Sequence, residues 1–156
     1  QIKGVFVMSA GQLCKRNVIT THRDCTIREA AQLMRKHHVG CLVITEEKSG
    51  KTEPVGIVTD RDIVMEVLAE NLEINDVNVG DIMSYALLKV QESDSIVETA
   101  QRMRARGVRR VPVVSGTREL IGIIALDDIL ELLSEELSML ARLTSREAEQ
   151  EHKKRA

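Results

Sequence analysis

Three residues spaced three apart carry groups that could bind a sugar and a phosphate. The segment VGIVTDRDIV (55–64) contains Gly56, Thr59 and Asp62 where an apolar run meets a polar turn. The Asp62 carboxylate can accept hydrogen bonds from both hydroxyls of a ribose. Thr59 offers a hydroxyl at the expected N-terminus of a helix, where free N–H groups and the helix dipole favour a phosphate. Gly56 would let a ligand approach the strand backbone closely.

The same spacing also has a purely structural interpretation. Thr59 and Asp62 form the capping-box pattern of a helix that begins near Asp60. In that case the carboxylate and the hydroxyl satisfy backbone N–H groups and bind nothing else. The two interpretations are compatible, so both are kept.

The motif lies within an internal repeat. Residues 26–39, TIREAAQLMRKHHV, align with residues 95–108, SIVETAQRMRARGV, and seven of the fourteen positions are identical. The segment 55–64 aligns in turn with IGIIALDDIL at 121–130. The chain is therefore expected to contain two copies of one structural unit.

Hydrophobic periodicity predicts the order β-α-β-β-α in each copy, over about 60 residues. Asp24 and Asp94 are predicted to cap the first helix of each copy. The expected strands are 18–20, 41–45 and 54–58 in the first copy and 87–90, 111–115 and 119–124 in the second. We therefore expect an α/β fold in which the two copies pack with pseudo-two-fold symmetry. The expected divisions are an N-terminal segment 1–11, repeats 12–72 and 73–135, and a C-terminal helix extension with a polar tail, 136–156.

These residues resemble a tandem pair of CBS domains, the regulatory module named after cystathionine β-synthase and also called a Bateman module. The resemblance rests on the repeat together with GIVTDRD, DIMS (81–84) and RRVPVV (109–114). It covers about residues 12–135 and implies a disc-like pair that often dimerises. It also implies a cleft between the repeats for an adenosine ligand such as AMP, ATP or S-adenosylmethionine. The family pattern Gly-x-x-Thr/Ser-x-x-Asp/Asn, with its ribose and phosphate contacts, maps onto Gly56, Thr59 and Asp62.

The resemblance also gives a role to Arg109 and Arg110, because basic residues at this place in the family often meet phosphates in the cleft. The matching residues of the first copy are the uncharged Gly40 and Cys41. A phosphate role would favour AMP, ADP or ATP over S-adenosylmethionine. Alternatively, the arginines belong to a solvated face paired with acidic neighbours.

The second copy departs from the pattern. Gly122 and Asp128 are kept, but Ala125 replaces the threonine, so the hydroxyl and its cap are lost. Asp127 could serve as a shifted cap, although its charge would repel a phosphate. Asp128 alone could still hold a ribose, which leaves the second pocket open.

Other candidate groups have simpler interpretations. His37 and His38 diverge by about 100° on a helix, so they are expected to end that helix and not to hold a metal. Cys41 is expected in the core. Tyr85 could cover an adenine or could lie at the surface or an interface. Because no Walker loop, GxSxG or HExxH motif is present, we expect no catalytic activity and no catalytic cofactor.

Composition excludes several function classes. The net charge of −2 argues against binding to nucleic acid or to an anionic membrane, and with only 1% aromatic residues there is little for stacking on bases. An adenine would therefore rest on aliphatic side chains. Three cysteines without CxxC spacing predict reduced thiols and a cytoplasmic protein, and no apolar run predicts a membrane span or a secretion signal. Met8, before Ser9 and Ala10, is a candidate start, with residues 1–7 upstream of it.

An apolar series continues past the second repeat at a spacing of about 3.5 residues. It comprises Ile129, Leu132, Leu133, Leu137, Leu140 and Leu143. A stripe this long predicts packing on another subunit, as in a homodimer, although the helix could instead fold back on its own sheet.

Together these observations predict a regulatory module that binds an adenine nucleotide between two repeats and modulates an unidentified partner or its own dimer. The alternatives are a structural dimerisation or scaffold module with degenerate sites, and a sensor of S-adenosylmethionine or NAD. Asp62→Ala would distinguish them, since a scaffold would lose only a helix cap, about 1 kcal/mol.

Overall fold

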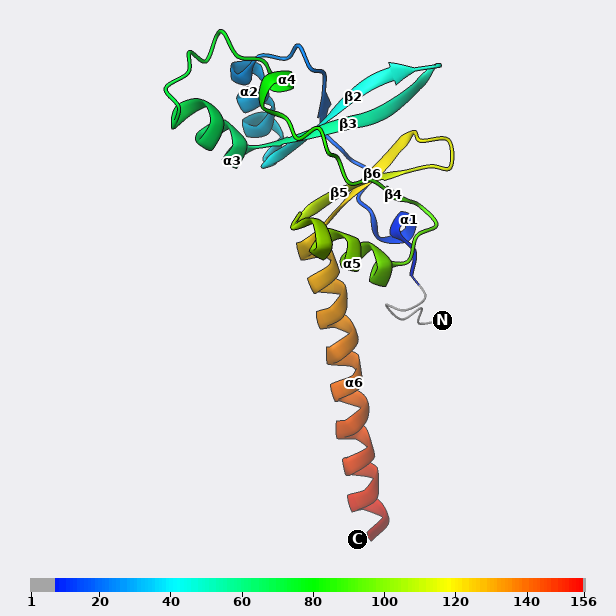
Figure 1. The fold of residues 1–156 in the computed structure, drawn as a ribbon. Helices are drawn as coiled ribbons and strands as arrows, with labels where there is room; N and C mark the ends of the chain where they lie inside the picture. The colour runs from blue at the N-terminus through cyan, green and yellow to red at the C-terminus, as the bar shows by residue number, and fades with distance from the viewer. Residues whose placement is uncertain (1–7, 156) are drawn as a thin grey trace.

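The computed structural model describes residues 8–155 and contains two three-stranded sheets, each with its own helices (Figure 1). The strands are β1 (Thr20–Thr21), β2 (Cys41–Lys48), β3 (Lys51–Thr59), β4 (Val90–Gln91), β5 (Arg110–Val114) and β6 (Leu120–Ala125). The helices are α1 (Ala10–Leu13), α2 (Ile27–His37), α3 (Asp60–Ile63), the π-helical turn η1 (Val64–Leu68), α4 (Val79–Ile82), α5 (Ile96–Arg106) and α6 (Leu126–Arg155). The hypothesis about residues 1–7 lies outside the described residues.

The two sheets are copies of one another. In each, a short first strand runs parallel to the second, which pairs antiparallel with the third. The register slips between Ile44 and Thr45 in one sheet and between Val113 and Val114 in the other, which are aligned positions. The predicted α/β fold with a repeated unit is therefore confirmed. The β2–β3 hairpin is longer than expected and turns at Ser49 and Gly50, both with positive φ.

The predicted helix caps were wrong. α2 begins after Thr26, whose Oγ1 accepts from the Glu29 N–H at 3.2 Å, and α5 begins after Ser95 in the same way. Asp94 instead accepts from the backbone N–H of Gln91 and from Arg102. Thr26 and Ser95, one or two residues after the predicted aspartates, cap the helices because they have extended backbone directly before the first helical turn.

The leading segment of each repeat packs in the core of the other. Ala10 and Cys14 belong to the core of the second repeat, whereas Val79 and Met83 belong to that of the first. Backbone hydrogen bonds anchor the crossing: Lys15 pairs with Ile123, and Ser84 donates its N–H to the carbonyl of Ile57 at 3.1 Å. Core membership therefore crosses the expected boundaries at 12–72 and 73–135, and the two repeats are interlocked.

The last helix differs from its counterpart in the first repeat. α3 and η1 together end at Leu68, but α6 continues for thirty residues and projects from the body (Figure 1). The expected C-terminal extension is thus helical through Arg155. Within residues 8–155, none of the helices combines the length and the apolar character that crossing a bilayer demands.

Candidate functional site

A cleft of about 470 Å³ lies where the two repeats meet, within the roughly 300–1,000 Å³ typical of small-molecule sites. The first repeat contributes the end of β3 and the first turn of α3, and the second contributes segments 84–88 and 107–110. The lining residues are Ile57, Thr59, Asp60, Arg61, Asp62, Ser84, Ala86, Leu87, Leu88, Gly107, Val108, Arg109 and Arg110. Four of the six predicted site residues are therefore brought together, although they lie about fifty residues apart in the chain.

Thr59 and Asp62 form the predicted capping box. The Thr59 N–H donates to Asp62 Oδ2 at 2.8 Å, and the Asp62 N–H donates to Thr59 Oγ1 at 3.1 Å. The Thr59 hydroxyl also donates to Oδ2. Both bonds to the carboxylate use Oδ2, so the other oxygen, Oδ1, accepts no hydrogen bond among the described residues. The half-buried Asp62 can therefore cap α3 and still accept from a ligand.

The opposite wall of the cleft is basic. Arg110 begins β5 and is half-buried, whereas Arg109 is exposed and lies 3.7 Å from the Asp127 carboxylate. Arg61 adds a third guanidinium, and Asp60 lines the cleft beside Asp62. Three guanidinium groups and two carboxylates therefore line the cleft, and only Arg109 and Arg110 lie on the wall opposite the carboxylates. This arrangement suits a ligand with hydroxyls at one end and negative charge at the other.

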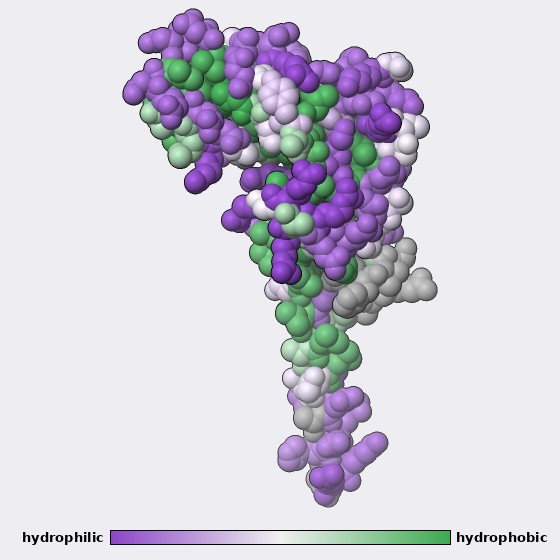
Figure 2. All heavy atoms as spheres, in the orientation of Figure 1, coloured by the Kyte–Doolittle hydropathy of each residue, from purple (hydrophilic) through white to green (hydrophobic). Residues whose placement is uncertain are grey.

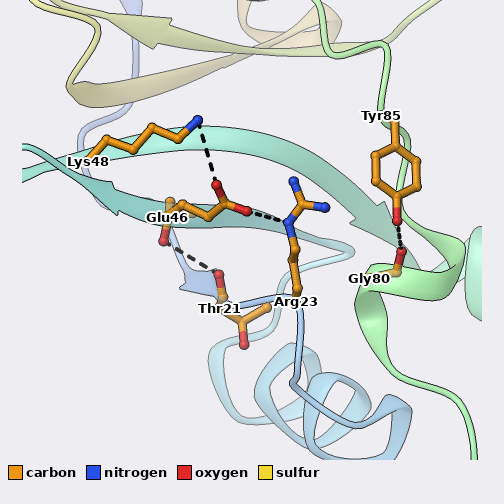
Figure 3. Close-up of polar contacts among 7 residues, drawn as sticks. Thr21, Arg23, Glu46, Lys48, Gly80 and Tyr85 are labelled. Carbon is orange, nitrogen blue, oxygen red and sulfur yellow. Dashed lines mark hydrogen bonds and ion pairs between the residues drawn. The ribbon is translucent and has the colours of Figure 1, made fainter.

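The remaining lining is aliphatic, and none of the lining residues is aromatic. Tyr85 lies between the lining residues Ser84 and Ala86 but is not itself among the lining residues, and its hydroxyl points to Gly80 (Figure 3). The guanidinium of Arg23 lies 5.5 Å from the ring centroid, and the phenol donates to the carbonyl of Gly80. Of the two roles considered for Tyr85, the cover over a base is therefore wrong and the surface role holds.

The Arg23 side chain also ties this linker to the first sheet. It pairs with Glu46, which lies 3.6 Å from Lys48 on the same strand (Figure 3). The cleft wall at 84–88 is thus held by side chains outside the cleft.

Gly56 does not line the cleft. A Cβ at this position would lie 2.7 Å from Met83 Sδ and 3.3 Å from the Ser84 carbonyl. Gly56 therefore leaves room for the segment that contains Met83 and Ser84, and not for a ligand. The prediction that Gly56 lets a ligand approach the strand was wrong.

Asp128 also lies outside the cleft. It is buried and accepts from the Ala125 N–H at 2.8 Å, and its second oxygen lies 2.6 Å from Lys15 Nζ. Hydrogen bonding to Asp128 raises the pKa of the Lys15 ammonium. Both carboxylate oxygens of Asp128 are thus engaged, whereas one oxygen of Asp62 is not.

Sequence reasoning missed Lys15 and the linker 84–88. The signal was available, because the offset of 69 that aligns the repeats also aligns Lys15 with Ser84. Lys15 belongs to the first copy and Asp128 to the second, so their ion pair follows only once the leading segments are known to cross between the repeats.

The histidine at the end of α2 and the cysteines have structural roles. His38 ends α2 in a left-handed conformation, at the place that Gly107 holds after α5. Burial raises the pKa of the Cys14 and Cys41 thiols. Within residues 8–155, no three His, Cys, Asp or Glu residues are grouped closely enough to hold a metal ion.

Comparison with known proteins gives a consistent result. The model of the CBS domain matches residues 10–69 and 79–135. An uncharacterised protein of Methanopyrus kandleri is 38% identical over 125 residues, which is 80% of this chain and 62% of that protein. The chain thus spans less than two thirds of the length of this relative.

Two solved structures share the fold and contain ligands. The protein PAE2072 from Pyrobaculum aerophilum, complexed with AMP, is 29% identical with a TM-score of 0.70 and covers 81% of this chain and 99% of its own. The CBS domain pair of protein MJ0100, in complex with 5′-methylthioadenosine and S-adenosyl-L-methionine, is 28% identical with a TM-score of 0.70. It covers 83% of this chain and 98% of its own.

Proposed function

The chain belongs to the CBS domain family, and from this premise we propose that its cleft binds an adenine nucleotide that regulates a partner or the assembly of the chain itself. One observation carries the proposal. The interlocked repeats place a carboxylate with a free oxygen, Asp62, in the same cleft as Arg109 and Arg110, over aliphatic side chains. The AMP-bound and S-adenosylmethionine-bound relatives support a ligand of this class.

Each end of the cleft suits one part of a nucleotide. Asp62 would accept from the ribose hydroxyls through the oxygen that the capping box leaves free. Arg109 and Arg110 would hold the phosphates, since a guanidinium can donate two hydrogen bonds to one anion. The adenine would pack on aliphatic residues such as Ile57 and Val108.

The charges in the cleft favour AMP, ADP or ATP. S-Adenosylmethionine carries a cationic sulfonium and an ammonium group beside a single carboxylate, so the three arginines suit it less well than they suit a phosphate. A sensor of S-adenosylmethionine is therefore the second choice, together with a sensor of NAD, whose diphosphate could also pair with the arginines. We further propose that the chain acts in the cytoplasm, as a homodimer, and as a binding module and not as an enzyme.

Arg109 provides a route from the cleft to α6. Its carbonyl accepts from the Leu126 N–H at 2.8 Å, and its side chain pairs with Asp127 in the first turn of α6. A phosphate that draws the guanidinium into the cleft would release Asp127 at the base of the long helix. The ligand would shift the position of α6 only by the difference between its affinities for the two arrangements.

A structural dimerisation module is the alternative function, and one observation favours it. Thr59 and Asp62 already satisfy each other, so the motif needs no ligand to explain it. A scaffold predicts that no adenosine compound changes the stability of the protein.

Thermal unfolding with AMP, ADP, ATP, S-adenosylmethionine and NAD, each at millimolar concentration, tests the proposal. A ligand at 100 times its Kd adds about 2.7 kcal/mol, which raises the Tm of a chain of this size by about 5–10 °C. We expect the adenine nucleotides to raise the Tm most. If none of the five raises it, nucleotide sensing is wrong and the scaffold function stands.

A further inference from the structure

α6 carries a line of leucines that the described structure leaves uncovered. These are Leu130, Leu133, Leu137, Leu140 and Leu143, which are 40–66% exposed. Only the first turns of α6 pack on the second core, through Leu126, Ile129 and Leu132. The space-filling view shows apolar side chains continuing down the projecting helix before the surface becomes polar at its end (Figure 2).

The spacing of the leucines is that of a coiled-coil seam. Steps of three and four residues connect Leu130, Leu133, Leu137 and Leu140, which places all four on one side of the helix. The charged residues Glu131, Glu135, Arg142 and Arg146 fall on the opposite side. The line from Leu130 to Leu143 is about 20 Å long at 1.5 Å per residue, and soluble proteins rarely leave such a face open to water.

Charge along α6 is polarised. Residues 126–140 include five acidic and no basic residues, whereas residues 141–155 include five basic and three acidic residues. A parallel pair of these helices would place the acidic halves side by side. An antiparallel pair would bring the basic end of each helix to the acidic half of the other.

We propose that α6 binds α6 of a second copy of this chain in antiparallel orientation, with the two-fold axis close to Leu137 and Leu140. Leu137 of one copy then packs against Leu140 of the other. With this axis, Arg146 of one copy lies level with Glu131 of the other, and Arg142 lies level with Glu135. The face complements itself in both shape and charge under a two-fold rotation, which closes a dimer and leaves no unpaired copy of the face. None of these leucines lines the cleft, so the surface can be tested without a nucleotide.

Sedimentation of the whole chain tests whether α6 is the interface. The wild type is expected at twice its 17.4 kDa mass, and the double variant Leu137→Glu/Leu140→Glu at the monomer mass. The matched control, Ser138→Glu/Ser145→Glu, adds the same two charges on the opposite side of α6 and should stay dimeric. Because these leucines lie outside both cores, circular dichroism should show folded protein in each case.

A second variant removes the apolar groups without adding charge. Leu137→Ala/Leu140→Ala keeps a strong helix propensity and is expected to weaken dimerisation at least tenfold. A monomeric wild type would overturn the proposal, as would a dimer that survives both leucine variants.

The distance between two spin labels tests the orientation. A label on Gln150→Cys, in a background with Cys41→Ser, is expected about 30–40 Å from its counterpart in an antiparallel dimer, because the two sites lie some 23 residues apart along the pair. In a parallel dimer the labels would lie within about 20 Å, and that result would overturn the orientation. Neither measurement requires a nucleotide, so a failure here is distinguishable from a failure of the proposed function.

Discussion

The turn after β3 and the turn after β6 have the same backbone but different chemistry. In each, an aspartate accepts from the N–H of the last strand residue, at 2.8 Å from Thr59 to Asp62 and at 2.8 Å from Ala125 to Asp128. The next N–H in each copy donates to an aligned carbonyl, from Asp60 to Gly40 and from Leu126 to Arg109. The duplicated fold thus preserves backbone geometry wherever backbone groups must be satisfied.

The side chains around the two aspartates have diverged. The leading segment of the second repeat places Ser84 in the cleft with Asp62. The leading segment of the first repeat places Lys15 beside Asp128, and the Lys15 ammonium forms an ion pair with that carboxylate. The arginines at 109 and 110 line the cleft that contains Asp62, whereas the aligned residues Gly40 and Cys41 carry no charge. The two repeats therefore share a backbone, but the side chains around each aspartate determine what that aspartate can bind.

The largest difference is expected in ligand affinity. In the proposed site, Asp62→Ala would remove the hydrogen bonds that the ribose hydroxyls donate to a charged group, worth about 1.5–3 kcal/mol, so nucleotide affinity should fall about 10- to 150-fold. Asp128→Ala removes the same cap bond from the other repeat and is the matched control. Calorimetric titration with AMP measures both. Equal losses in the two variants would show that the caps, and not the cleft, determine binding.

The two strand glycines should differ in their effect on stability. A Cβ at Gly122 would meet Cys14 Cβ and the Lys15 carbonyl at 2.9 Å, whereas at Gly56 its nearest neighbour is the movable end of Met83. Gly122→Ala is therefore expected to lower the free energy of unfolding by about 2 kcal/mol and Gly56→Ala by about 1 kcal/mol. Denaturant unfolding compares them. A larger loss at Gly56 would mean that Met83 cannot move aside.

Removing the capping hydroxyl from one turn and adding one to the other should change the stability of the protein in opposite directions. Thr59→Ala removes the hydroxyl that caps α3 and is expected to cost about 1 kcal/mol, whereas Ala125→Thr adds one at the start of α6 and should stabilise the protein by up to about 1 kcal/mol. Thermal unfolding without ligand measures both changes. If Ala125→Thr is destabilising, the two turns are less alike than their backbones indicate.

The smallest expected difference between the two turns is in how stability depends on alkaline pH. The pKa of Lys15 is raised above its usual 10.5, so its ion pair contributes fully below that pH and is lost as the pH rises through the raised pKa. The pair joins an exposed lysine to a buried carboxylate, and Lys15→Met is expected to cost up to about 1 kcal/mol at pH 8. This gap between variant and wild type should narrow above pH 10.5. Ser84→Ala, at the aligned position, should show a gap that does not change with pH.

Much of the fold could be read from the sequence, because it depends on patterns between near neighbours. The apolar periodicity around Ile27 and Ile96 and the alternation in the strands specify helices and strands in order. The caps were misplaced by one or two residues, since Asp24 and Thr26 are both good capping residues and only the backbone conformation chooses between them. The capping box at Thr59 and Asp62 was predictable because both partners lie within one turn.

The sequence by itself thus determined the repeat, the fold and the pair Thr59 and Asp62, all of which rest on short-range spacing. Only the tertiary structure decided which of the candidates face a common cleft. The crossing of the leading segments brings Ser84 to Asp62 and Lys15 to Asp128, buries Gly56 against Met83 and turns Tyr85 away. Those outcomes depend on contacts between residues far apart in the chain, where one lysine in place of a serine is enough to give Asp128 an ion-pair partner.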